Sequence, residues 1–298
     1  MKANAIIRII VFSVAIILLS YILLGTFSMN YYFENGRLNS YEMAAPAPTE
    51  AAVQVHQQDI STQVQNIEID WVAGSIVIHP SDSLSDIIVE ESSSAGSNYN
   101  IVVKQSGQTL KIKFCEESIN LSSFGINKVV SKDLVIRVPK NWNCNHLEID
   151  TAETDVTIQD LTINELDFDG ASGKVILDHC NIENLDIDTA SGDVEFVGTL
   201  DNLDFDAASA KFCGEFYNCP RSLKMDSMSG DLELVLPEYA GFELSMETVS
   251  GSFDTDFTIG KHDDLYICGD GNCKINVSAM SSDVSILKGI TAGKNCDH

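Results

Sequence analysis

The stretches LEIDTAETDVTI (147–158), LDFDGASGKVIL (166–177) and LDIDTASGDVEF (185–196) decide the fold, because they repeat one pattern at a step of 19 residues. Each has an aspartate after two alternating apolar residues, then a small turn cluster, then a second alternating pair. A short fixed period indicates stacked supersecondary units rather than one compact globule. We call the aspartate position the slot residue; it recurs at Asp70, Asp150, Asp169, Asp188, Asp206, Asp226, Glu247 and Ser278.

Four positions of every unit are predicted to face the core: three and one before the slot residue, and six and eight after it. Thirty of these 32 positions are apolar, and the exceptions are Gly214 and Thr255. At a hydrophobic content of 44%, roughly 14 would be apolar by chance. The two alternating pairs therefore predict two strands, each with one buried face.

Between the two strands of a unit lies a corner. Its sequence often ends in Ser-Gly, as in TASG (189–192), and glycine adopts backbone angles that other residues avoid. The position two after the slot residue is apolar in all eight units. We expect that side chain to fill a tight inner corner.

The predicted fold is an all-β solenoid, resembling a single-stranded β-helix with about 19 residues per coil. The alternative is a β-roll or sandwich of antiparallel hairpins, because strand–turn–strand units are common to both. The nearly constant step between units, 19, 19, 18 and 20 residues through the middle, favours the solenoid.

The chain divides into four predicted segments. Residues 1–27 form a cytoplasmic stub and a transmembrane anchor, 28–62 a flexible tether, 63–290 the β-strand-repeat domain and 291–298 a tail. Within the domain, 63–145 is a divergent N-terminal part and 146–290 holds the regular repeats. The anchor prediction rests on Ile9–Phe27, an uncharged apolar run that follows Lys2 and Arg8 and is long enough to span a bilayer. The alternative is a cleaved signal peptide, but the run is long for one and no small-x-small cleavage site follows closely.

Net charge agrees with export. Two of the 18 basic residues, Lys2 and Arg8, belong to the anchor, so the rest of the chain holds 16 basic and 44 acidic residues, a net charge of −28. Such a surface repels nucleic acid and attracts cations and cationic peptides. Solubility alone also explains it.

Eight cysteines in an exported domain are compatible with disulfides. Cys268 and Cys273 bracket Gly-Asp-Gly-Asn, and Cys213 and Cys219 bracket one expected turn between units, so both pairs are candidate short staples. A zinc site is disfavoured because no CxxC occurs and no histidine stands at ligand spacing from a cysteine pair.

The repeats quoted above, together with LKMDSMSGDLELVLP (223–237) and LVIRVPKNWN (134–143), resemble the bacterial "putative-adhesin" β-strand-repeat family over residues 63–290. The resemblance implies an exported, solenoid-like domain of unknown function, often held by one N-terminal helix, with some relatives linked to envelope-stress signalling. Together with the Ile9–Phe27 run and the preceding Lys2 and Arg8, it predicts a bacterial cell membrane location, single-pass, with the C-terminal domain extracytoplasmic.

Stacking in register would place Asp150, Asp169, Asp188, Asp206 and Asp226 in a column about 4.8 Å apart, where like charges repel. We expect each carboxylate to be satisfied by backbone N–H groups of its own corner. The alternative is a row of bound Ca²⁺, for which these five residues are weak candidates. No other metal and no cofactor is predicted.

The sequence predicts no catalysis. Every prominent aspartate belongs to the repeat, the six histidines are scattered, and no HExxH, GxSxG or phosphate loop occurs. A polysaccharide-active β-helix enzyme is the less favoured alternative. The predicted function is a membrane-anchored extracytoplasmic binding or scaffold protein, adhesin-like, whose partner is an envelope protein, a glycan or a cationic ligand. The alternative is an extracytoplasmic component of an envelope-stress pathway that acts through a membrane partner.

Overall fold

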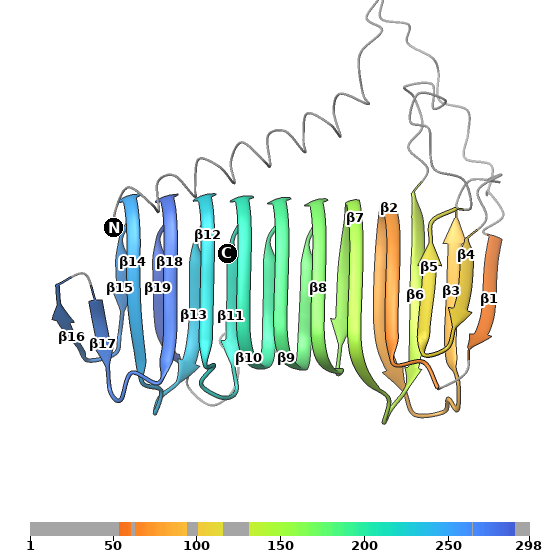
Figure 1. Cartoon of the computed structure of the whole chain (residues 1–298), viewed down its shortest axis with the longest axis horizontal. Helices are drawn as coiled ribbons and strands as arrows, with labels where there is room; N and C mark the ends of the chain where they lie inside the picture. Colours follow the sequence, from red (N-terminus) through yellow and green to blue (C-terminus); the bar gives the residue numbers. More distant parts are fainter. Residues whose placement is uncertain (1–53, 61–62, 94–100, 116–130, 264, 290–298) are drawn as a thin grey trace, which may run out of the picture.

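The computed structural model describes residues 54–60, 63–93, 101–115, 131–263 and 265–289, which build one stack of nineteen strands (Figure 1). Neighbouring central units pair in parallel with their slot residues opposite each other, as Asp150 with Asp169 and Asp169 with Asp188. A roll of hairpins would pair them antiparallel. The all-β solenoid prediction is therefore confirmed.

Each coil consists of a strand before the Ser-Gly corner and a strand after it, so the coils stack into a first face and a second face. The longest strands bend round a corner and contribute to both faces. The central strands are β7 (Asn143–Gln159), β8 (Thr162–Ser172), β9 (Val175–Ser191), β10 (Val194–Ser209), β11 (Phe212–Phe216), β12 (Ser222–Ser229) and β13 (Leu232–Pro237).

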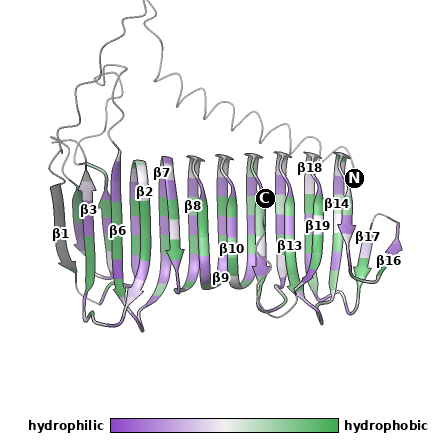
Figure 2. Ribbon diagram, turned by 180° about the vertical axis from the view of Figure 1, so that it is seen from behind, coloured by the Kyte–Doolittle hydropathy of each residue, from purple (hydrophilic) through white to green (hydrophobic). Residues whose placement is uncertain are grey.

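The core runs the length of the stack between the two faces, and alternating bands of hydrophobic and hydrophilic residues mark the strands that line it (Figure 2). Of the thirty apolar core positions, only Met246 and Phe253, both in one terminal coil, are not buried. Phe205 of the first face meets Phe212 of the second with 5.6 Å between ring centroids. Burial of this kind, at roughly 1.5–3 kcal/mol per large side chain, is the main driving force for stacking.

The two exceptions in the core pattern have local reasons. Gly214 lies between two aromatic rings, and a Cβ there would stand 2.6 Å from Phe216 and 2.9 Å from Phe212. Phe216 therefore occupies the space that a larger residue at 214 would need. At Thr255 the polar hydroxyl is satisfied by a hydrogen bond, because its Oγ1 donates to the Ile286 carbonyl at 2.5 Å.

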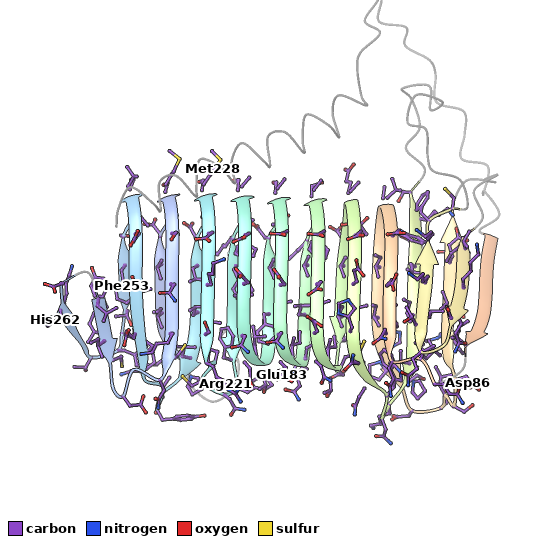
Figure 3. All side chains as sticks on the ribbon, in the orientation of Figure 1. Asp86, Glu183, Arg221, Met228, Phe253 and His262 are labelled. Carbon is purple, nitrogen blue, oxygen red and sulfur yellow. The ribbon has the colours of Figure 1, made fainter. Side chains whose placement is uncertain are left out.

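The apolar position two after the slot residue was expected inside the corner, and this is wrong, because none of the eight side chains is buried. Val249 is 79% exposed and Met280 48% exposed, and Met228 stands at the outer edge of the corner in Figure 3. The reason is strand alternation. The residue one after the slot turns inward, as the buried Trp71, Ala207 and Ala279 show, so the next residue turns outward.

At the N-terminal end the coils do not stack in sequence order. β2 (Asn66–Ser81) pairs with β7 on one side, and on the other side it pairs in parallel with β5 (Thr109–Lys113) and β6 (Lys132–Pro139). The coil built from β5 and β6 therefore lies outside the earlier β2. Antiparallel strands continue this end: β1 (Gln54–Ile60), β3 (Ile87–Ser93) and β4 (Val102–Ser106).

The C-terminal end shows the same inversion. β18 (Cys273–Ser281) pairs in parallel with both β12 and β14 (Phe242–Ser250), and β19 (Val284–Gly289) pairs with both β13 and β15 (Phe253–Thr255). The last coil in sequence is thus inserted before the coil that precedes it. The antiparallel hairpin of β16 (Ile259–His262) and β17 (Leu265–Cys268) covers the first part of the outer edge of β14, residues 242–245, which otherwise would offer free backbone groups.

The predicted anchor, Ile9–Phe27, lies outside the described residues. Among the residues that the structure describes, no helix is long and apolar enough to cross a membrane.

Candidate cation-binding face

Two columns of carboxylates run side by side on the outer surface of the first face, because strand alternation turns every second residue outward. In each pair of neighbouring coils the same positions lie in register. We define the acidic face as these two columns: the slot column Asp70, Asp150, Asp169, Asp188, Asp206 and Asp226, and the column two residues earlier, Glu68, Glu148, Asp167, Asp186 and Asp204. Carboxylates in one column recur at about 4.8 Å, the spacing of paired strands.

Lysines stand at both ends of the acidic face. At the N-terminal end Lys111 contacts Glu68 and Lys113 contacts Asp70. At the other end the Lys224 Nζ lies 2.6 Å from Asp204, 3.2 Å from Asp226 and 3.5 Å from Asp206.

Between these ends, within the described ranges, no ion pair reaches four of the carboxylates: Asp150, Asp169, Asp186 and Asp188. The pKa values of Asp150 and Asp188 show the effect of this crowding of carboxylates. Partial burial, followed by repulsion from Asp206 and Asp169, raises the pKa of Asp188 to about 6. Burial together with Asp169 raises the pKa of Asp150 to about 6. At mildly acidic pH, then, the middle of the face holds protons that a bound cation would displace.

Lys224 and the carboxylates around it shift one another's pKa values. Burial would lower its pKa, but the surrounding Asp204, Asp206 and Asp226 outweigh burial and raise it, so this lysine remains charged. The pKa of Asp206 nevertheless rises to about 6, because its own burial exceeds the help from Lys224. Its Oδ1 is buried, and Lys224 Nζ at 3.5 Å makes an ion pair with it but no hydrogen bond. One lysine is thus insufficient for the carboxylates around it.

The expectation that corner amides satisfy the slot aspartates is wrong. The carboxylates that accept corner N–H groups are five residues further on and bond across to the next coil: Asp155 from Lys174, Asp193 from Lys211, Asp231 from Asp283 and Asp283 from Ser252, at 2.8–3.0 Å. A slot residue is still in its strand and points straight out of the sheet, away from the corner amides. The charge of a slot aspartate can therefore be neutralised by a lysine, a proton or a bound ligand, but not by the corner amides.

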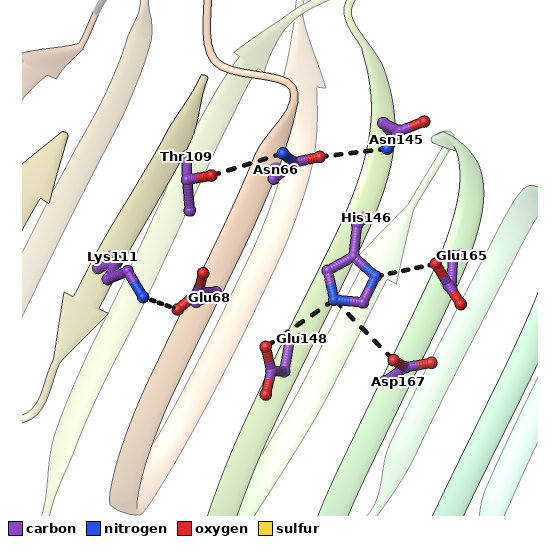
Figure 4. A network of polar contacts seen from close by, with 9 residues as sticks. All are labelled: Asn66, Glu68, Thr109, Lys111, Asn145, His146, Glu148, Glu165 and Asp167. Atoms are coloured by element: carbon purple, nitrogen blue, oxygen red, sulfur yellow. Dashed lines mark hydrogen bonds and ion pairs between the residues drawn. The ribbon is translucent and has the colours of Figure 1, made fainter. Parts of the chain in front are cut away.

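A histidine cluster adjoins the N-terminal half of the acidic face (Figure 4). His146 Nδ1 lies 3.2 Å from Glu165, and its Nε2 lies 3.8 Å from Glu148 and 3.9 Å from Asp167. Ligand atoms of His146, Glu165 and Asp167 lie within 4.8 Å of one another, close enough to share one cation. Sequence reasoning missed this cluster by treating the histidines as scattered; the signal was the 19-residue step from His146 to Glu165, which equals one coil.

The candidate disulfides are not formed. Cys219, Cys268 and Cys273 are free thiols, and Cys213 is disulfide-bonded but not to Cys219. Cys268 and Cys273 both pair with Phe242, but from opposite sides of β14, so roughly two strand spacings, about 9.6 Å, separate them. Cys213 is held away from Cys219 by the length of β11. The four residues do not come together as expected; Cys219 instead approaches Cys273.

Three solved structures that are similar to this chain share little sequence with it. A "putative adhesin" of Bacteroides fragilis is 14% identical, with a TM-score of 0.46 over 78% of this chain and 96% of its own. A "putative lipid binding protein" of Parabacteroides distasonis is 18% identical, with a TM-score of 0.40 over 80% of this chain and 97% of its own. A "putative cell adhesion protein" of Clostridium sporogenes is 11% identical, with a TM-score of 0.36 over 80% of this chain and 100% of its own. No functionally curated protein matches the sequence.

The Toastrack DUF4097 domain description matches residues 64–287, about three quarters of the chain. This range holds every coil of the solenoid, and the match confirms the family resemblance inferred from the repeats. The chain belongs to the Toastrack DUF4097 family.

Proposed function

We propose that this chain is a membrane-tethered, extracytoplasmic binding protein that acts without catalysis and captures a polycationic ligand on its acidic face. The observation that supports this most is the run of unpaired carboxylates between the lysine ends, with pKa values of Asp150 and Asp188 raised to about 6. Solubility requires only scattered charge. A need for solubility therefore does not explain why the carboxylates are aligned in two columns, where they repel one another.

The geometry favours a polycation over a row of Ca²⁺. Calcium takes six to eight oxygen ligands at roughly 2.3–2.6 Å. On a flat face the strand carbonyls are engaged in the ladder, so each ion would meet only a few carboxylates spaced about 4.8 Å apart. The ammonium groups of an extended lysine- or arginine-rich segment need only one or two carboxylates each and can lie along the columns.

Binding should depend on protonation. At pH 5 the slot carboxylates with a pKa of about 6 are largely protonated, and at pH 7.5 they are largely ionised. A polycation should therefore bind more tightly at pH 7.5 than at pH 5. Added salt should weaken binding, because the contacts are exposed to solvent.

The test uses the full-length chain in detergent with fluorescently labelled decalysine, followed by anisotropy. The double variant Asp169→Asn/Asp188→Asn should bind about tenfold more weakly, since each exposed charge pair contributes roughly 1 kcal/mol or less. Glu183→Gln is the control. It removes one negative charge, half as many as the double variant, at the corner opposite Met228 (Figure 3). A control that loses half or more of the binding free energy lost by the double variant, or equal binding of decaglutamate, would refute a specific acidic face.

A further inference from the structure

The inserted C-terminal coil brings together two cysteines that lie far apart in sequence. Cys219 belongs to the turn before β12, and Cys273 begins β18, the strand that lies between β12 and β14. Lys274 N donates to Arg221 O at 2.9 Å, which places residue 273 beside that turn.

One carbonyl joins the two cysteines. Gly241 O accepts from the Cys273 amide at 3.0 Å and from the Cys219 thiol at 3.7 Å. Sharing this carbonyl brings the two cysteines side by side, and each thiol shifts the pKa of the other. Cys268, the third cysteine in this region, directs its thiol to the Ala240 carbonyl at 3.7 Å instead.

We propose that Cys219 and Cys273 form a disulfide that fastens the inserted last coil to the turn before β12. Cys219 precedes β12 and Cys273 begins β18, so the bond would close a large loop that contains β12 to β17. Closing a large loop restricts the unfolded chain more than a short staple does.

The surroundings of the two thiols determine which cysteine attacks the oxidant first. A hydrogen bond from the Cys273 thiol lowers the pKa of the half-buried Cys219. The same contact, followed by burial, raises the pKa of Cys273. Cys219 is therefore the first nucleophile.

A disulfide such as oxidised glutathione serves as the oxidant. The Cys219 thiolate attacks one of its sulfurs, forming a mixed disulfide and releasing one glutathione thiolate. Cys273 then loses its proton and attacks Cys219 Sγ, which expels the second glutathione. Two protein thiols lose two electrons and two protons, and one oxidant disulfide becomes two thiols.

The test uses the full-length chain in glutathione buffers of increasing oxidised fraction, quenched and digested without reduction. We expect a linked peptide that contains Cys219 and Cys273, and a rise in Tm of about 10 °C over the form in which this bond is reduced. Cys219→Ser should lose both the linked peptide and the Tm rise, and Cys268→Ser should retain both.

Cys219→Ser is the informative variant, because Cys219 is only half-buried, whereas replacement of the fully buried Cys273 endangers folding by itself. Cys144 and Cys180 are an internal reference, since burial raises the pKa of each to about 12 and they should stay reduced. Persistence of both thiols in fully oxidised glutathione would overturn the proposal, as would a linked peptide that contains Cys268. The outcome does not depend on polycation binding.

Discussion

At the residue scale, the solenoid depends on positions where a side chain of one size is required. Phe205 is fully buried and packs on Phe212, whereas the adjacent Asp204 points outward to Lys224. Gly230 has the opposite requirement, since the neighbouring coil leaves no room for a Cβ. Both requirements result from close packing of coils about 4.8 Å apart.

The first prediction contrasts two adjacent residues. Phe205→Asp should unfold the repeat domain, because it buries an unpaired charge in the core. Asp204→Asn should cost less than about 1 kcal/mol, the usual limit for an exposed ion pair such as that with Lys224. Thermal melts followed by circular dichroism measure both. Similar melting temperatures for the two variants would contradict the strand assignment.

The second prediction concerns the corner. Gly230→Ala should destabilise the domain by about 1–3 kcal/mol, because its Cβ would stand 2.0 Å from the Ala210 carbonyl oxygen and force two coils apart. Ser229→Ala, at the exposed neighbouring position, is the matched control and should change stability little. Chemical denaturation compares them. A neutral Gly230→Ala would show that coils at this corner can separate freely.

At the element scale, the first-face strands combine two opposed effects. Their inner residues build the core, and the same alternation aligns their outer carboxylates in columns that repel. Protons relieve the repulsion, because burial and neighbouring charges raise the pKa of Asp150, Asp188 and Asp206 to about 6.

The third prediction rests on the sign of those shifts. Between pH 7 and about 4, the folded state takes up protons on these groups before the unfolded state does, so stability should increase as pH falls through 6. The Tm should therefore be higher at pH 5 than at pH 7.5, and Asp188→Asn should reduce the difference by raising the Tm at pH 7.5. Scanning calorimetry measures this. Glu183→Gln serves as control, and the opposite pH trend would argue against proton sharing on the face.

At the scale of the whole molecule, both ends of the solenoid reverse the order of two coils. The β5/β6 coil lies outside β2, and the β18/β19 coil lies inside the β14/β15 coil. The first and last coils in sequence are therefore each flanked on both sides, and antiparallel strands lie beyond the outer coils. Such an arrangement limits edge-to-edge association of the stacks.

The fourth prediction concerns topology. A reporter fused after His298 should be active only outside the cytoplasmic membrane, and the intact chain should remain in the membrane fraction, because Ile9–Phe27 is long and apolar and follows Lys2 and Arg8. Cell fractionation with protease protection measures both. Release of a shortened soluble product would support a cleaved signal peptide instead.

The sequence by itself determined the coil, because the information is local and repeated. Period-2 alternation identifies the buried face of each strand, and a 19-residue step brings equal positions into register, so Asp150, Asp169 and Asp188 align as predicted. The carboxylate column could therefore be predicted, together with nearly all of the core.

Only the tertiary structure decided which coils are neighbours at the two ends. The choice of β18 as the partner of β12 depends on matching edges formed by segments far apart in sequence, and no local pattern records that choice. Side-chain contacts between coils were decided in the same way. Cys219 meets Cys273 because one coil is inserted, and His146 meets Glu165 and Asp167 because coils stack. The slot carboxylates lack corner amides because their strands continue past them into the turn.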